Sequence, residues 1–199
     1  MLAGVTSLHL STNRVDRSYQ SVQFHYEAMH VSGILPVQGP VRGGTRVTLT
    51  GSGLHSATCV IGRHSAAATI ITSSLMHCTA PPAAAGNATV FVASSSGAIA
   101  LNTFTFEYTP GARIAALHPA SGPALGGQVV TIRGMHFSAD RNAAACHFGL
   151  VTVDATIMNN TAARCISPAL PQSRIPLELS LNGYDTSSSG VIFEVMGFD

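Results

Sequence analysis

The chain has 199 residues, of which 46% are hydrophobic and 10% charged, and its formal net charge is +1. This balance excludes a disordered, highly charged chain, and the scattered basic residues exclude a phosphate-binding surface, so we expect no nucleic-acid partner. No stretch approaches the roughly 20 apolar residues of a membrane span. The start at residues 1–5 lacks the pattern of a signal peptide. We therefore expect any secretion signal or membrane span to lie outside this sequence.

The first predicted element is a pair of strands within residues 1–27. Apolar and polar residues alternate in residues 8–12 (LHLST) and 22–26 (VQFHY), which is the period of a strand with one buried face. The same pattern recurs 169 residues later, in residues 177–182 and 191–195. We therefore expect residues 1–27 to be the last strands of a module whose beginning is missing. Such a hairpin is marginal by itself.

A glycine-rich segment and a strand follow. Residues 39–51 (GPVRGGTRVTLTG) predict a tight turn at Gly43 and Gly44 that needs positive φ, and then a strand of alternating burial that ends at Gly51. Residues 122–134 (GPALGGQVVTIRG) repeat this segment 83 residues later. A repeat of this length predicts two copies of one structural unit.

The second half of the unit also repeats. Residues 59–62 (CVIG) and 68–78 recur at residues 146–149 (CHFG) and 155–165, now 87 residues later. Glycine, proline and serine clusters separate the short strands, and no apolar pattern of helical period reaches helix length. The chain is therefore predicted to be all-β and to form a β-sandwich in each repeat.

The order of these signals resembles the IPT/TIG family (immunoglobulin-like, plexin, transcription-factor type). The resemblance rests on the Gly-Pro-x-x-Gly-Gly-Thr-x-Val-Thr-Leu-x-Gly pattern, on two later cysteines, the second near proline, and on the closing strand at residues 104–108 (FTFEY). It covers residues 34–108 and 114–196 as whole modules and residues 1–27 in part. The resemblance implies an all-β fold of tandem immunoglobulin-like Greek-key β-sandwiches. Because modules of this kind occur in the extracellular stalks of plexins, the resemblance implies an extracellular or cell-surface location.

Four cysteines allow three pairings, and the repeat favours one pair in each module. Cys59 and Cys78 are separated by 19 residues, as are Cys146 and Cys165, so we predict two disulfides of equal loop size. The alternative is a pair of buried free thiols in each module. No Cys-x₂₋₄-Cys pair occurs, so zinc is not expected, and we predict no other metal or cofactor.

Two N-glycosylation sequons occur, beginning at Asn87 (NAT) and Asn159 (NNT). Both are expected in turns, where a glycan would be accessible in a secreted protein. The alternative is that such short patterns arise by chance in a chain rich in serine and threonine.

No catalytic residue is predicted, because no nucleophile elbow, P-loop or His-Glu-x-x-His motif occurs and the acidic residues and histidines are dispersed. The expected role is a non-catalytic structural or recognition module at the cell surface. Its expected partners are other surface proteins or neighbouring IPT/TIG modules of the same chain. An accessory module of a carbohydrate-active enzyme is an alternative, disfavoured by the absence of tryptophan. An intracellular dimerisation module of a transcription factor is another, disfavoured by the paired cysteines and the sequons.

Overall fold

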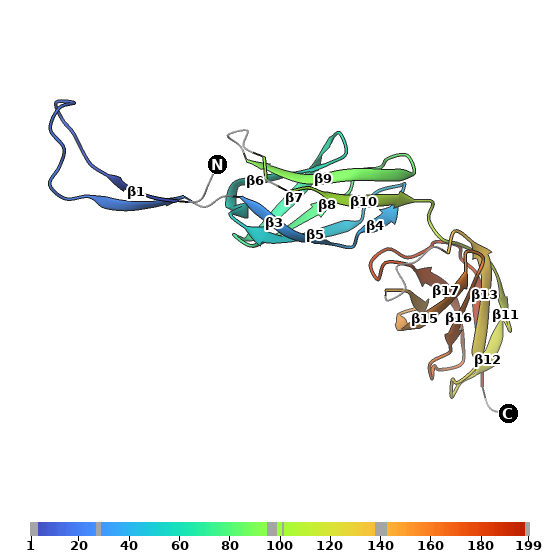
Figure 1. Cartoon of the computed structure of the whole chain (residues 1–199). Coiled ribbons are helices and arrows are strands. Elements are labelled where there is room, and N and C mark those ends of the chain that lie inside the picture. The colour runs from blue at the N-terminus through green and yellow to red at the C-terminus, as the bar shows by residue number, and fades with distance from the viewer. Residues whose placement is uncertain (1–3, 27–28, 95–98, 101, 138–142, 198–199) are drawn as a thin grey trace. The chain divides into compact units, whose positions relative to one another are not determined.

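The computed structural model describes residues 4–26, 29–94, 99–100, 102–137 and 143–197, and these residues are mostly strands (Figure 1). They form a two-stranded hairpin and two eight-stranded sheets. A short 3₁₀ turn, η1 (Leu54–Ser56), follows the first long strand of the first eight-stranded sheet. The predicted all-β class is thus confirmed.

The N-terminal hairpin pairs β1 (Gly4–Leu8) with β2 (Val22–Tyr26) in antiparallel register, with Leu8 opposite Val22. Its apolar side chains remain accessible to solvent, since Leu8 is 54% and Phe24 is 49% exposed. Leu177 and Phe193, which repeat Leu8 and Phe24 169 residues later, are fully buried in the second sandwich. The hairpin therefore carries the apolar pattern of a sandwich core on an exposed face.

The first sandwich is one sheet that folds over to form two layers. β4 pairs in parallel with β10, whereas β3 pairs with β5, so the strands nearest the start of the module lie at the two ends of the sheet. The strand order is β3-β5-β8-β7-β6-β9-β10-β4. The strands are β3 (His30–Leu35), β4 (Gln38–Pro40), β5 (Arg46–Ser52), β6 (Ala57–Ile61), β7 (His64–Thr72), β8 (Leu75–Thr79), β9 (Gly86–Ser94) and β10 (Phe104–Thr109).

The second sandwich repeats this order position by position, as β11-β13-β16-β15-β14-β17-β18-β12. Its strand β15 pairs with β14 over residues 151–154 and with β16 over residues 155–159, so this single strand passes from one layer to the other. The strands are β11 (Arg113–His118), β12 (Ser121–Pro123), β13 (Val129–Met135), β14 (Ala145–Phe148), β15 (Val151–Asn159), β16 (Ala162–Ile166), β17 (Ser173–Ser180) and β18 (Ile192–Met196).

The strands with alternating sequence bury one face, as predicted. β5 and β13 have the same succession of buried and exposed positions, and Val47, Leu49, Val130 and Ile132 are completely buried. Each sandwich also contains an edge-to-face aromatic pair. The ring centroids of Phe106 and Tyr108 lie 5.0 Å apart in the first sandwich, and those of Phe148 and Phe193 lie 5.2 Å apart in the second. Burial of this apolar surface is the main stabilising contribution to each sandwich.

The backbone requires glycine at two places, in the turn before β5 and at the end of β5 and of its equivalent β13. Gly43 and Gly44 have φ values of 72° and 90°, which are conformations that side chains with a Cβ rarely adopt, and this confirms the predicted turn. At the end of β5, a Cβ on Gly51 would lie 2.0 Å from the carbonyl oxygen of His30, and the equivalent Gly134 is as close to the carbonyl oxygen of Arg113. Strands β3 and β11 can approach β5 and β13 this closely only where glycine is present.

The chain divides into two compact units. One contains residues 1–35, 47–78 and 89–105. The other contains residues 36–46 and 79–88, from one end of the first sandwich, together with residues 106–199. The contacts that residues 36–46 make with the second sandwich therefore lie within one unit.

Candidate functional site

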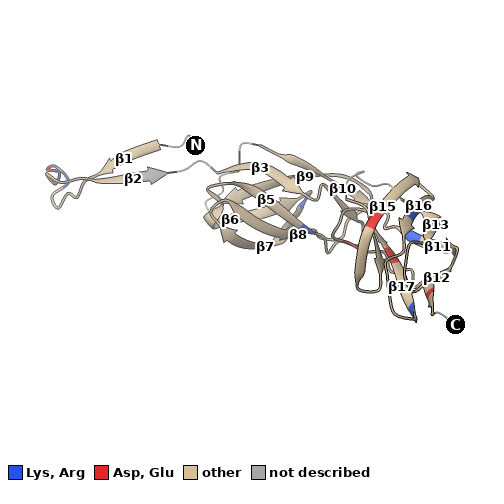
Figure 2. Cartoon of the chain, turned by 90° about the horizontal axis from the view of Figure 1, so that it is seen from below, with Lys and Arg blue, Asp and Glu red and all other residues tan. Residues whose placement is uncertain are grey.

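Acidic and basic side chains are sparse, and Figure 2 shows them at the tip of the N-terminal hairpin and scattered over the sandwiches. Within the described part of the chain, no three His, Cys, Asp or Glu side chains are placed to hold a metal ion together. Burial raises the pKa of Tyr108, whose hydroxyl donates to the carbonyl oxygen of Pro81 at 2.8 Å. Burial also lowers the pKa of His147. Tyr108 and His147 belong to different sandwiches, and desolvation accounts for the pKa shift of each.

Each sandwich contains one disulfide at the predicted positions. The structure joins Cys59 on β6 to Cys78 on β8, with Cα atoms 6.2 Å apart, and Cys146 on β14 to Cys165 on β16, with Cα atoms 6.4 Å apart. All four residues are at most 3% exposed. Because β7 and β15 lie between the bonded strands in the sheet order, each disulfide connects the two layers across the core.

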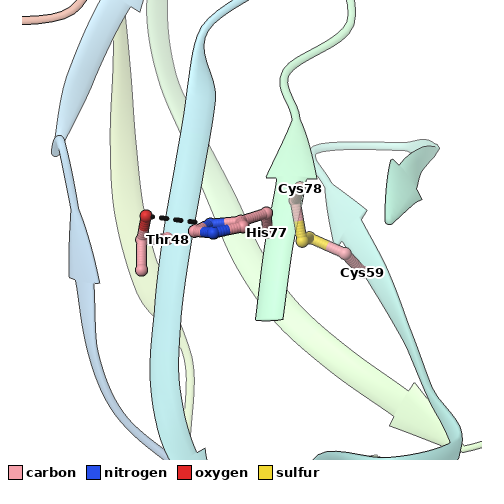
Figure 3. Close-up of a disulfide and its surroundings, with 4 residues drawn as sticks. All are labelled: Thr48, Cys59, His77 and Cys78. Carbon is pink, nitrogen blue, oxygen red and sulfur yellow. Dashed lines mark hydrogen bonds between the residues drawn. A yellow bond between two sulfur atoms is a disulfide. The ribbon is translucent and has the colours of Figure 1, made fainter. Parts of the chain in front are cut away.

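The histidine next to Cys78 does not take part in the cysteine site. Figure 3 shows His77 and Cys78 on opposite sides of β8, as alternation along a strand requires. The Nδ1 atom of His77 lies 3.1 Å from the hydroxyl of Thr48, whereas Cys78 points toward Cys59. The cysteines therefore act as a structural cross-link, and His77 faces away from them.

Both sequon asparagines are exposed, but they lie at strand ends and not in the expected turns. Asn87 is the second residue of β9, and Asn159 is the last residue of β15. The side-chain oxygen of Asn159 accepts hydrogen bonds from the amide and the hydroxyl of Thr161, both at 2.9 Å. This geometry leaves the side-chain nitrogen of Asn159, the atom that a glycan would modify, outside those two bonds.

A turn between β17 and β18, at residues 182–185 (NGYD), is held by its own side chains. The side-chain oxygen of Asn182 accepts hydrogen bonds from the amides of Tyr184 at 3.0 Å and Asp185 at 2.8 Å. Its side-chain nitrogen donates to Asp185 Oδ2 at 2.7 Å, and Gly183 has a φ of 76°. The side chains of Asn182 and Asp185 therefore fix the shape of this turn independently of contacts outside it.

The same turn contacts residues 38–45 within its compact unit. Asn182 Nδ2 donates to the backbone oxygen of Gln38 at 3.0 Å, and the Thr45 hydroxyl donates to Asp185 Oδ2 at 2.7 Å. The Arg42 guanidinium donates to the carbonyl oxygen of Thr186 at 3.0 Å. Asn182 and Gln38 are 6% and 8% exposed and Thr45 is 1% exposed, so these polar groups are satisfied away from water.

An equivalent turn at residues 13–16 (NRVD) was not predicted. The side-chain oxygen of Asn13 accepts from the amides of Val15 at 3.0 Å and Asp16 at 2.9 Å, and Asn13 Nδ2 donates to Asp16 Oδ2 at 2.6 Å. The 169-residue repeat that matches Leu8 to Leu177 also matches both residues of this turn. Extending that alignment by a few residues would have identified the turn from sequence.

An apolar surface lies on the outer side of β13, β15 and β16. Val129 and Ile166 are opposite each other across β13 and β16, and they are 48% and 59% exposed. Met158 on β15 is 52% exposed. We call these three residues the outer apolar face. They border a shallow groove of about 650 Å³, which is also lined by Val153, Asp154, Thr156, Arg164, Cys165, Ser167 and Pro168.

Known proteins resemble this chain over most of its length. Fibrocystin-L of Mus musculus is 26% identical over an alignment of 189 residues, and the match covers 89% of this chain and 4% of that protein. The structure of the full extracellular region of plexin A4, domains 1 to 10, matches with a TM-score of 0.64 at 18% identity, over 99% of this chain and 18% of that one. A structure of plexin A4 domains 1 to 8 matches with a TM-score of 0.51 at 18% identity, over 92% of this chain and 20% of that one.

These likenesses to plexin A4 show the fold, and the chain spans only a small part of each protein. Among the described residues, no helix is long and apolar enough to cross a membrane. The family model of the IPT/TIG domain matches residues 29–108 and 112–195, close to the two modules predicted from the repeat. The chain belongs to the IPT/TIG domain family.

Proposed function

We propose that this chain is a non-catalytic recognition segment of an extracellular or cell-surface protein, and that it binds another protein through the outer apolar face. The observation that carries the proposal is a difference between the two sandwiches. The positions of Val129 and Ile166 are occupied in the first sandwich by Arg46 and Thr79. The fold therefore does not require apolar residues there.

The chemistry of the outer apolar face suits a protein partner. Beside its exposed aliphatic side chains lie polar groups that can form directional bonds. These are Thr156 and Arg164, which face each other across β15 and β16 and line the same groove. Arginine beside exposed apolar residues is a common composition at the centre of protein interfaces. A solvated sheet surface would instead carry polar residues at these positions.

The extracellular setting has independent support. Two buried disulfides fit a protein that folds in an oxidising compartment. The matching plexin A4 structures are of an extracellular region. In the same setting we propose that Asn87 and Asn159 carry N-glycans, because both side chains are exposed and each sandwich contains one of the two sequons.

Binding of labelled chain to intact cells tests the proposal. The variant Val129→Ser/Ile166→Ser is expected to lose at least about tenfold in affinity, as expected for residues at the centre of an interface. Ile71→Ser is the matched control, since Ile71 is the counterpart of Met158 in the first sandwich and is 49% exposed. Protease treatment of the cells should abolish binding if the partner is a protein. Equal saturable binding by the two variants, or none by the wild type, would overturn the proposal.

A further inference from the structure

The turn at residues 182–185 has an inner and an outer set of hydrogen bonds. The inner set joins Asn182 to Asp185 and to the turn backbone, and it fixes the shape. The outer set joins Asn182 to the Gln38 carbonyl and Asp185 to the Thr45 hydroxyl. One preformed turn thus recognises one carbonyl acceptor and one hydroxyl donor on the end of another sandwich.

The turn at residues 13–16 has the same inner set, and its side chains are exposed. The match includes the backbone, because Arg14 has a φ of 65° where Gly183 has a φ of 76°. Residues 13–16 therefore present the same two groups, an asparagine side-chain nitrogen and an aspartate oxygen, in the arrangement that contacts Gln38 and Thr45 elsewhere in the chain.

The sandwich fold does not require this turn. The corresponding residues of the first sandwich are 95–98 (SSGA), which carry neither asparagine nor aspartate. Residues 95–98 lie outside the described residues. Two of the three copies of the module carry the turn. The turn at residues 182–185, whose contacts are described, binds the end of another module. The turn is therefore a feature of association between modules and not of the fold.

We propose that residues 13–16 are a docking element for the end of another IPT/TIG module. The partner is a module end that presents a strand carbonyl at the position of Gln38 and a hydroxyl at the position of Thr45. The end of the second sandwich does not fit this description, since Gln128 stands at the position of Thr45 and Leu125 at that of Arg42. The inference deepens the proposed recognition role by naming a partner class for a surface other than the outer apolar face.

A turn exchange in the full chain tests whether residues 13–16 can dock. Gly183→Arg/Tyr184→Val converts the docked turn to the sequence of residues 13–16 (NRVD). In a double-mutant cycle on the wild type, the effects of Thr45→Val and Asp185→Ala on unfolding should not be independent. We expect a coupling of about tenfold in the unfolding equilibrium constant, as for a buried hydrogen bond to a carboxylate. The same coupling is expected in the exchanged chain. If the double exchange does not fold, Tyr184→Val alone, which keeps Gly183, provides the measurement.

A second exchange is the negative control. Replacing residues 182–185 with the SSGA sequence of residues 95–98 should remove the docking contact, so that the Thr45 methyl resonance moves away from its wild-type position. That resonance should stay in place in the NRVD chain. A moved resonance or a lost coupling in the NRVD chain overturns the inference, as does an absence of coupling in the wild type. Cell binding through the outer apolar face is measured separately, so failure of one proposal is distinguishable from failure of the other.

Discussion

The two sandwiches share their strand order and their buried positions but differ where side chains face outward. Val60 lies opposite Phe91 across β6 and β9, and at the equivalent place His147 lies opposite Glu178 across β14 and β17. An apolar pair in one sandwich is thus a polar pair in the other. The inward-facing pattern maintains the fold, and the outward-facing positions are free to differ.

The polar pair has a structural role that the apolar pair cannot perform. The Glu178 carboxylate accepts hydrogen bonds from the Ser187 hydroxyl and from the amides of Ser189 at 3.0 Å and Gly190 at 2.8 Å. These bonds hold the segment that leads from the 182–185 turn to β18. The outer surface of the second sandwich therefore shapes the same hairpin that carries its docking turn.

The largest expected effect tests whether the two disulfides are equivalent. Replacing Cys59 and Cys78, or Cys146 and Cys165, with alanine should destabilise the affected sandwich by about 2–5 kcal/mol, because loops of equal length lose equal constraint. Urea unfolding followed by amide resonances of each sandwich provides the measurement, and peptide mapping of the wild type verifies the pairing. If one pair of replacements destabilised its sandwich and the other pair did not, the two cross-links would not be equivalent.

The next effect concerns the glycines that end β5 and β13. Gly51→Ala and Gly134→Ala should each cost about 1–3 kcal/mol, because the new Cβ would lie 2.0 Å from a carbonyl oxygen and the neighbouring strand must move. Gly33→Ala is the control, since its Cβ would lie 3.4 Å from the Thr50 hydroxyl oxygen. Comparable unfolding midpoints for all three variants would contradict the close-approach explanation.

A smaller effect concerns the edge strands β3 and β11. The Asn102 side chain bonds to both the amide and the carbonyl of Val31, whereas the hydroxyl of Ser189, its counterpart, accepts one hydrogen bond among the described residues, from the Ile114 amide at 2.8 Å. Asn102→Ala should therefore cost about 1–2 kcal/mol and Ser189→Ala about 1 kcal/mol. Amide exchange of Val31 and Ile114 measures both losses. Faster exchange at Ile114 than at Val31 in the respective variants would reverse the expected order.

The sequence predicted the fold more completely than the surfaces. Strand alternation, the glycine turn and the cysteine spacing depend on local rules, and a repeat doubles the evidence for each. The outer apolar face could not be predicted, because Val129 and Ile166 are 37 residues apart and become neighbours only through the pairing of β13 with β16. The turn at residues 13–16 is local and was within reach, since Asn13 and Asp16 match Asn182 and Asp185 in the same repeat.

The smallest expected effect is a pH dependence confined to the second sandwich. Burial lowers the pKa of His147, whose Nδ1 atom lies 3.1 Å from the Thr152 hydroxyl. Its Nε2 atom is buried without a hydrogen-bond partner among the described residues. Because the folded state holds the imidazole proton less tightly than the unfolded chain, the unfolded state gains protons first as the pH falls through about 6.5, and stability decreases. His147→Val, which installs the residue of the first sandwich, should reduce this decrease between about pH 7 and pH 5.5. Urea midpoints of the second sandwich across this range provide the measurement. An unchanged pH dependence in the variant would show that a group other than His147 is responsible.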